Sequence, residues 1–327
     1  VFAISGLHVG IVTAVVVMAL RLLRVPRRWC GLVAIPLLVL YVFATGARPG
    51  AVRALVMASV WLAGWMLVRP TDGLSNLAAA ALVILLWQPV QLFDGGFILS
   101  FGVVLALLTI APRILGWLKR FVAPDEFLPG QLAPRWRLWM ERPVVWFVQL
   151  LSCSLAAWIG LLPLMAVYFH LFTPISILAN VLVVPMLGLI IALGMASAAA
   201  HAVWPWLTLT FNNANFFLLS TMIRGVEWLG RIPGGHQFVQ APPAWLVVAY
   251  YVVLALLLNR TLAKRHKRLA LAVVLPLLSA AILFIAWPED AVEITALDLP
   301  DGMAVFVNAP GEQHDWLLDG GGDWSGE

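Results

Sequence analysis

Hydrophobic residues in this chain gather into long stretches, and polar residues lie mainly in the short intervals between them. A helix that crosses a bilayer needs about 20 largely apolar residues. By that measure, ten candidate membrane segments precede residue 288: 1–21, 29–46, 50–68, 73–88, 95–118, 143–169, 173–202, 204–230, 243–260 and 268–287. The pattern predicts an all-α polytopic membrane protein with about ten membrane helices, some of them interfacial or broken.

Two of these segments carry more polar residues than a helix in contact with lipid. Segment 50–68 has Arg53 near its start, and segment 204–230 contains three asparagines together with Arg224 and Glu227. Each segment could lie along the membrane interface or line a cavity instead of spanning the lipid. Arg224 and Glu227 are three residues apart on a predicted helix, and we expect them to pair with each other.

The pattern changes abruptly after Pro288, where strand-like alternation and turn residues replace the long apolar stretches, and more than half of the 16 acidic residues lie there. About 39 residues are too few to close a core alone. We therefore divide the chain into a membrane domain, 1–288, and the beginning of a β-rich domain, 289–327. Because the chain starts at Val1 rather than Met and ends just after a strand-like run, we expect both of its ends to be truncated. Three short strands are expected: 292–297, 303–307 and 316–318.

Composition and charge give the class and the orientation of the chain. It is 62% hydrophobic and 11% charged, whereas soluble domains carry roughly 25% charged residues. The loops richest in lysine and arginine are 21–28, 113–142 and 260–268. The positive-inside rule assigns these loops to the cytoplasm, and four segments separate each of them from the next. We expect a multi-pass membrane protein with Val1 and the residues after about 288 on the outer side.

Polar residues inside membrane segments are costly, so each is a candidate for function. The first segment contains Ser5 and His8 in the run Ser-Gly-Leu-His; a small-residue helix contact with a hydrogen-bonded histidine is the simpler alternative. Arg48 and Arg53 follow an outer loop, and both could extend to the interface. Since an arginine facing lipid at the bilayer centre costs roughly 2.5–3.5 kcal/mol, we expect Arg53 to point to protein, to water or to an anion.

Two further stretches predict distorted or broken helices. Asp94 to Gly102 has paired glycines at a helix start and includes Phe97 and Ser100, and Asn180 lies shortly before Pro185. Unwound backbone within a membrane is tolerated where it lines a water-filled cavity. The two stretches are therefore candidates for the lining of a passage.

No catalytic constellation is complete in this sequence. The six histidines form no metal-ligand spacing, and we find no phosphate-binding loop, so energy from ATP would have to come from another protein. The two cysteines, Cys30 and Cys153, are expected to be buried free thiols. We predict no catalytic residue, no metal site and no cofactor in this chain.

Several runs, in this order and spacing, resemble the ComEC/Rec2-type competence proteins, which form the inner-membrane channel for DNA uptake. The resemblance covers nearly all 327 residues. It rests on residues 3–10 (AISGLHVG), 48–54 (RPGAVRA), 96–101 (GFILSF), Asn180 ahead of Pro185, 297–304 (LDLPDGMA) and 317–321 (LLDGG).

The resemblance implies a channel in the bacterial inner membrane that passes single-stranded DNA into the cytoplasm. It implies an external DNA receptor and a cytoplasmic DNA helicase as partners, beside the lipid bilayer. Residues 289–327 then resemble the start of a metallo-β-lactamase-like domain, whose divalent metal would belong to a longer parent protein. The chain departs from that domain's first motif, because Pro300 replaces a glycine and Met303 stands where an acidic residue is expected. We expect no nuclease activity from these residues alone.

Two other functions fit the ten-segment architecture without the resemblance: a small-solute or lipid transporter, and a membrane-anchored hydrolase whose catalytic part lies mostly beyond this chain. The ordered motifs favour the DNA channel. The predicted DNA pathway is a polar, water-accessible passage where these residues converge: Ser5, His8, Arg48, Arg53, Phe97, Ser100 and Asn180.

Overall fold

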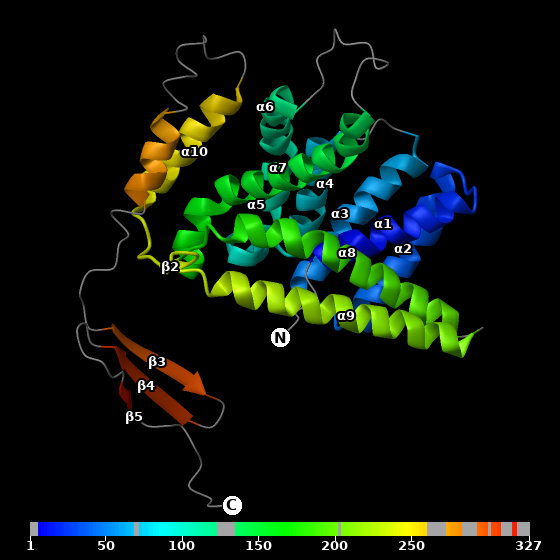
Figure 1. Cartoon of the computed structure of the whole chain (residues 1–327). Coiled ribbons are helices and arrows are strands. Elements are labelled where there is room, and N and C mark those ends of the chain that lie inside the picture. The colour runs from blue at the N-terminus through cyan, green and yellow to red at the C-terminus, as the bar shows by residue number, and fades with distance from the viewer. Residues whose placement is uncertain are drawn as a thin grey trace, which may run out of the picture.

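A computed structural model describes residues 6–68, 72–122, 135–201, 204–259, 273–282, 293–299, 302–308 and 316–318. Within this part the chain is mostly helical (Figure 1). The helices are α1 (Gly6–Leu22), α2 (Arg27–Ala44), α3 (Pro49–Met66), α4 (Gly73–Trp87), the 3-10 helix η1 (Pro89–Phe93), α5 (Gly95–Thr109), α6 (Ala111–Val122), α7 (Arg135–Phe169), α8 (Ser176–His201), α9 (Pro205–Gly230) and α10 (Ala244–Leu258), followed by the short helix Val273–Ile282.

Each of the ten predicted segments contains a helix among the described residues. The fifth segment is divided into α5 and α6, which meet at Ile110. Pro112 explains the division, because proline lacks the amide hydrogen that would continue α5 and is well suited to a first helical turn. The prediction of a mainly helical multi-pass chain is confirmed, with this one internal boundary added.

Five helical stretches of the described residues are long and apolar enough to cross a membrane: Arg27–Ala44, Pro49–Met66, Gly95–Arg120, Arg142–Phe169 and Ser176–His201. Four shorter apolar helices, at Gly6–Leu22, Gly73–Trp87, Ala244–Leu258 and Val273–Ile282, accompany them. Of the two segments with more polar residues, 50–68 meets the criterion as α3. The other, 204–230, does not meet it, although α9 is 26 residues long.

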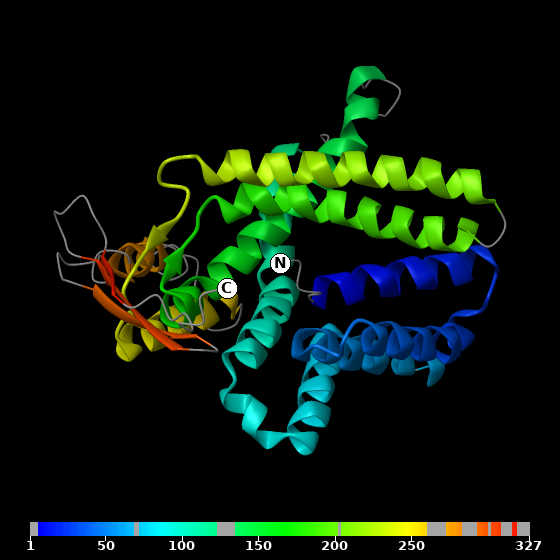
Figure 2. The same cartoon turned by 90° about the horizontal axis from the view of Figure 1, so that it is seen from below.

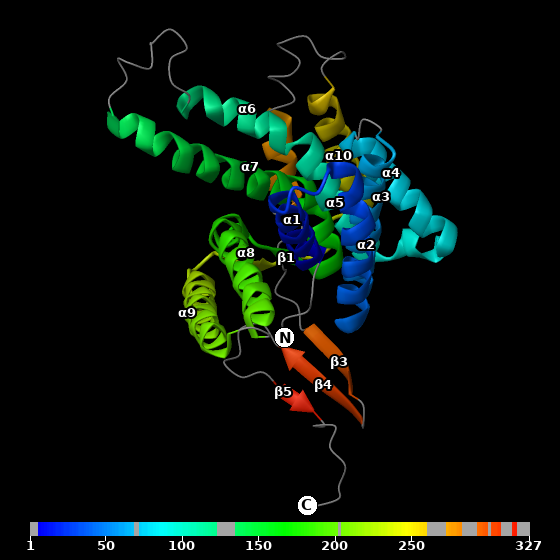
Figure 3. The same cartoon turned by 90° about the vertical axis from the view of Figure 1, so that its right-hand side faces the viewer.

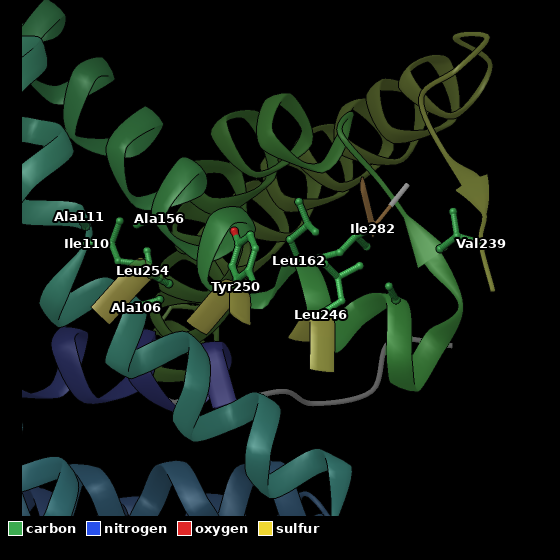
Figure 4. Packing of buried hydrophobic residues seen from close by; sticks show 11 residues of the cluster. Ala106, Ile110, Ala111, Ala156, Leu162, Val239, Leu246, Tyr250, Leu254 and Ile282 are labelled. Carbon is green, nitrogen blue, oxygen red and sulfur yellow. The ribbon is translucent and has the colours of Figure 1, made fainter. Parts of the chain in front are cut away.

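The helices pack around two hydrophobic clusters. The first joins α1, α2 and α3, and one face of α8 covers it through Ile191 and Met195. The second joins α5, α6, α7, α10 and the helix Val273–Ile282, and Figure 4 shows its side chains meeting between these elements. α3 also packs against α5, which brings the first cluster next to the second. The fully or nearly fully buried members of the second cluster include Ala156, Leu246, Tyr250 and Ile282.

Helix α7 contains Pro163 and stays helical through it. Proline at this position cannot donate to the carbonyl oxygen of Ile159, four residues earlier. The hydroxyl of Tyr250 in α10 donates to that oxygen instead, at 2.8 Å, and the hydroxyl of Tyr251 donates to the carbonyl of Gly160 at 3.0 Å. α10 therefore satisfies backbone groups of α7 that water cannot reach inside a membrane.

Helices α8 and α9 lie side by side and run antiparallel along one side of the molecule (Figure 2). Ser197 donates to the side chain of Asn212 at 2.7 Å across this pair. Before α8 and after α9 lie two short strands, β1 (Leu171–Phe172) and β2 (Gln237–Phe238), which pair antiparallel. This pairing ties the end of α7 to the end of α9.

The end of the chain forms a three-stranded antiparallel sheet (Figure 3). Its strands are β3 (Glu293–Leu299), β4 (Gly302–Asn308) and β5 (Trp316–Leu318), with β4 in the middle. In the β3–β4 register, Asp298 lies opposite Met303 and Leu299 opposite Gly302. The three strands agree with those predicted from the alternation of residues after Pro288, to within one or two residues at each end.

Candidate functional site

Helices α3 and α5 are joined at their first turns by an ion pair. Nη1 of Arg53 donates to Oδ2 of Asp94 at 3.2 Å. Arg53 is 7% exposed, whereas the Asp94 side chain is 50% exposed. This is the one ion pair formed within the part of the chain that the structure describes. The buried guanidinium thus has one neutralising partner, and that partner faces the surroundings.

Asp94 can pair with Arg53 because it lies directly before the first residue of α5. It is the N-cap of α5, and its Oδ1 accepts a hydrogen bond from the backbone amide of Gly96 at 3.2 Å. Aspartate is a preferred N-cap residue, and its charge is favourable at the positive end of a helix. One carboxylate therefore serves the backbone of α5 with one oxygen and the guanidinium from α3 with the other.

The guanidinium of Arg53 lies unusually close to the backbone of α5. A Cβ atom on Gly96 would stand 2.9 Å from Nη2 of Arg53, so a larger residue at this position would displace the guanidinium. Nε of Arg53 is buried and has no hydrogen-bond partner among the described residues. Since a guanidinium offers five N–H donors, Arg53 keeps donor capacity beyond its bond to Asp94.

The first turn of the described part of α1 packs against the start of α3. A Cβ atom on Gly6 would lie 3.3 Å from Cβ of Ala54 and 3.4 Å from the carbonyl oxygen of Gly50. This contact brings the half-buried His8 to the same end of α3 as Arg53. Ser5 lies outside the described residues.

The other predicted residues on α3 and α5 differ in exposure. Arg48 is exposed and is the N-cap residue of α3, in extended backbone conformation. Phe97 is 5% exposed, and its ring lies against that of Phe101 with the centroids 4.3 Å apart. Ser100 is half-buried on α5. One face of Phe97 is therefore covered by another ring of its own helix.

Asn180 lies apart from this group, in a cavity between α7, β1 and α8. The cavity has a volume of about 180 Å³. Asn180 itself is exposed and makes no side-chain hydrogen bond to another described residue. The structure thus brings Arg53 to the start of α5 and the start of α1 to the start of α3, whereas Asn180 lines a cavity formed by other elements, α7, β1 and α8. The predicted convergence of all these residues on one passage stays a prediction.

Sequence reasoning missed the role of Asp94 and predicted one ion pair wrongly. Asp94 was noticed only as part of a glycine-rich stretch, although an aspartate directly before two glycines and an apolar run is an N-cap signal. Arg224 and Glu227 do not form the predicted pair: both are exposed on α9, and their charged groups are not within ion-pair distance. An exposed pair at this spacing gains only about 0.2–0.5 kcal/mol, which is too little to fix two long side chains.

The described residues contain no group of three or more histidine, cysteine, aspartate or glutamate side chains that could hold a metal ion. Cys30 is buried and Cys153 is exposed, and neither forms a disulfide. Cys153 therefore differs from the expectation that both thiols are buried. At the Arg53–Asp94 pair, Nε of Arg53 is a hydrogen-bond donor without a partner among the described residues, beside the carboxylate that neutralises the guanidinium.

Comparison with known proteins gives one family and two curated relatives. Residues 1–264 match the family model described as "Competence protein". Over 333 aligned positions the chain is 28% identical to "ComE operon protein 3" of Bacillus subtilis (strain 168), with 99% of this chain and 38% of that protein covered. It is 26% identical to "Uncharacterized protein YcaI" of Escherichia coli (strain K12), with 95% of this chain and 39% of that protein covered.

The chain therefore spans about two fifths of the length of the curated relatives it matches. No solved structure matches it.

Proposed function

Because the chain belongs to the competence protein family, we propose that it forms the membrane channel through which one strand of DNA enters the cytoplasm during natural transformation. The observation that carries this proposal is the buried guanidinium of Arg53 at the meeting point of α3 and α5. A phosphodiester group that displaced the exposed Asp94 carboxylate would find a guanidinium with donors to spare.

The electrostatics of this meeting point suit an anionic substrate. Each nucleotide of single-stranded DNA carries one negative charge, and a low-dielectric membrane opposes its passage. The first turns of α3 and α5 add the partial positive charge of two helix N-termini to that of Arg53. A single fixed cation lowers the barrier, whereas a row of cations would trap the strand, because every neutralised phosphate strengthens binding.

The basic loops support one orientation of the proposed channel in the membrane. The end of α6, the beginning of α7 and the end of α10, which flank two of the basic loops, lie at the same side of the helical part (Figures 1 and 3). With that side in the cytoplasm, the start of α3, the start of α5 and the three-stranded sheet would be extracytoplasmic. The strand would therefore meet Arg48, Arg53 and Asp94 early on its way through the bacterial inner membrane.

The partners and the sheet belong to the same proposal. DNA would reach the channel from an external receptor and be drawn inward by a cytoplasmic helicase. β3, β4 and β5 would begin a metallo-β-lactamase-like domain completed by residues beyond this chain, and any divalent metal would bind there. Support comes from the alignment with "ComE operon protein 3", which covers 99% of this chain and so includes the sheet.

Transformation assays test the proposal. The full-length protein carrying Arg53→Gln or Arg53→Glu would replace the wild type in a naturally transformable host, with Arg224→Gln on α9 as the control for a lost positive charge. We expect both Arg53 variants to lower transformation at least tenfold at unchanged protein level in the membrane, and the Arg224 variant to transform normally. Normal transformation by Arg53→Glu would remove Arg53 from the pathway.

A further inference from the structure

The cavity beside Asn180 has two chemically different walls. Trp158 of α7 and Phe172 of β1 form an aromatic corner, with ring centroids 5.6 Å apart and planes inclined by 59°. Thr173, Ser176 and Asn180 supply the polar wall. No lining residue is charged, so the cavity is built for a neutral group that is apolar on its faces and polar on its edge.

The hydrogen bonds already made leave the side chain of Asn180 available. The hydroxyl of Ser176 donates to the carbonyl of Thr173 at 2.6 Å. The amide of Asn180 makes no hydrogen bond within the described part of the chain. An amide offers one acceptor and two donors, and it pairs through two hydrogen bonds with the edge of a nucleobase.

The cavity is connected to the Arg53–Asp94 pair through α7. A Cβ atom on Gly95, next to Asp94, would stand 2.9 Å from the ring of Tyr168 in α7. Leu161, two turns earlier on α7, lines the cavity and lies against Gly102 of α5. The proposed phosphate contact and the uncharged aromatic cavity thus lie on helices, α5 and α7, that pack directly against each other.

We propose that the cavity between α7, β1 and α8 is a nucleobase subsite of the DNA pathway, with one base stacked on Trp158 or Phe172 and its edge bonded to Asn180. This inference rests on the proposed transport of DNA. The size agrees with a single-ring base: an apolar cavity of roughly 150 Å³ accepts benzene, and this one measures about 180 Å³. Stacking of this kind tolerates any sequence, because every base has an aromatic face.

Binding of two oligonucleotides to the purified full chain in lipid nanodiscs tests the proposal. One probe is oligothymidylate, and the other is an abasic strand with the same number of phosphates. Base–aromatic stacking corresponds to about 5-fold to about 160-fold in affinity per base, so we expect at least a fivefold preference for oligothymidylate.

Three variants test whether the cavity causes the preference for oligothymidylate over the abasic strand. Ala157→Leu fills the cavity and Asn180→Leu removes the amide at similar bulk, and both should abolish or reduce the preference while leaving the affinity for the abasic strand unchanged. Ala199→Leu adds the same bulk at an exposed position of α8 and should keep the wild-type preference.

The outcomes separate this inference from the proposed function. Equal affinity for both strands, or a preference that Ala157→Leu leaves intact, overturns the nucleobase subsite while DNA binding stands. Binding of neither strand overturns both. A lipid that copurifies with the wild type and is lost from Ala157→Leu, seen by native mass spectrometry without any base preference, assigns the cavity to an acyl chain and overturns the subsite.

Discussion

Replacing Asp94 with asparagine removes the charge that neutralises Arg53 and leaves the remaining geometry in place. Asparagine has nearly the same shape as aspartate and is an equally good N-cap, so the hydrogen bond to the amide of Gly96 can persist. What the variant loses is the electrostatic attraction across the 3.2 Å contact. If DNA phosphates compete with the Asp94 carboxylate for the guanidinium, Asp94→Asn should bind DNA more tightly than the wild type.

The size of the effect follows from the distance and the exposure. Two unit charges at 3.2 Å attract by about 1 kcal/mol in water and by about 5 kcal/mol at an effective dielectric constant of 20. Because half of the Asp94 side chain is exposed, solvent screening brings the value toward the lower limit. We expect a loss of about 1–2 kcal/mol in unfolding free energy and a gain of about 5-fold to about 30-fold in affinity for single-stranded DNA.

The assay is oligonucleotide binding to purified protein at several salt concentrations, beside thermal unfolding in the same detergent. One additional phosphate contact should steepen the slope of log affinity against log salt by about 0.7. Asp72→Asn is the matched control, because Asp72 caps α4 through Ser75 and contacts no arginine in the described structure. Reduced stability together with unchanged or weaker DNA binding would refute the idea that Asp94 competes with phosphate, and would leave the pair a purely structural link.

Four further predictions concern topology, chemistry and packing. Cysteine labelling of intact cells should reach position 298 and not position 267; labelling of Asp298 only after the inner membrane is permeabilised would contradict the ten-segment topology. The purified 327-residue chain should not cleave DNA with divalent metals, and metal-dependent cleavage that a substitution within it abolishes would contradict this. Gly96→Ala should lower the unfolding free energy by about 1–3 kcal/mol through contact with Arg53, whereas Gly50→Ala, with open space around it, should be neutral or stabilising. Tyr250→Phe should cost about 0.5–2 kcal/mol, because it leaves a carbonyl of α7 without a donor; a melting temperature equal to that of the wild type would contradict the assigned role.

The helices and strands could be predicted from the sequence because their signals are local. Apolar stretches of membrane length, interrupted by prolines and glycines, located the helices, and alternation after Pro288 located the strands. The division at Ile110 was missed, since one proline within a long apolar stretch also occurs inside continuous helices, as Pro163 does in α7.

The candidate site was harder to predict because it depends on contacts between distant residues. Arg53 and Asp94 are 41 residues apart, and no local pattern relates the start of one membrane helix to the start of another. Because a lipid-facing arginine is costly, the sequence predicted that Arg53 points to protein, to water or to an anion. It did not identify Asp94 as the partner. The aromatic cavity was missed for the same reason, since Trp158 and Phe172 come together only when α7 ends and β1 turns back beside it.

The hydrogen bond from Tyr250 to Ile159 has a consequence for the synthesis of the protein. Donor and acceptor are separated by 91 residues. The ribosome must therefore add 91 residues after Ile159 before Tyr250, the donor to its carbonyl, has been synthesised. At roughly 5–20 residues per second, α7 waits about 5 to about 18 seconds with a carbonyl that its own backbone cannot satisfy. During this interval we expect α7 to stay in contact with water, with lipid headgroups or with the insertion machinery. We therefore expect the arrival of α10 to be the step that lets α7 enter the hydrocarbon.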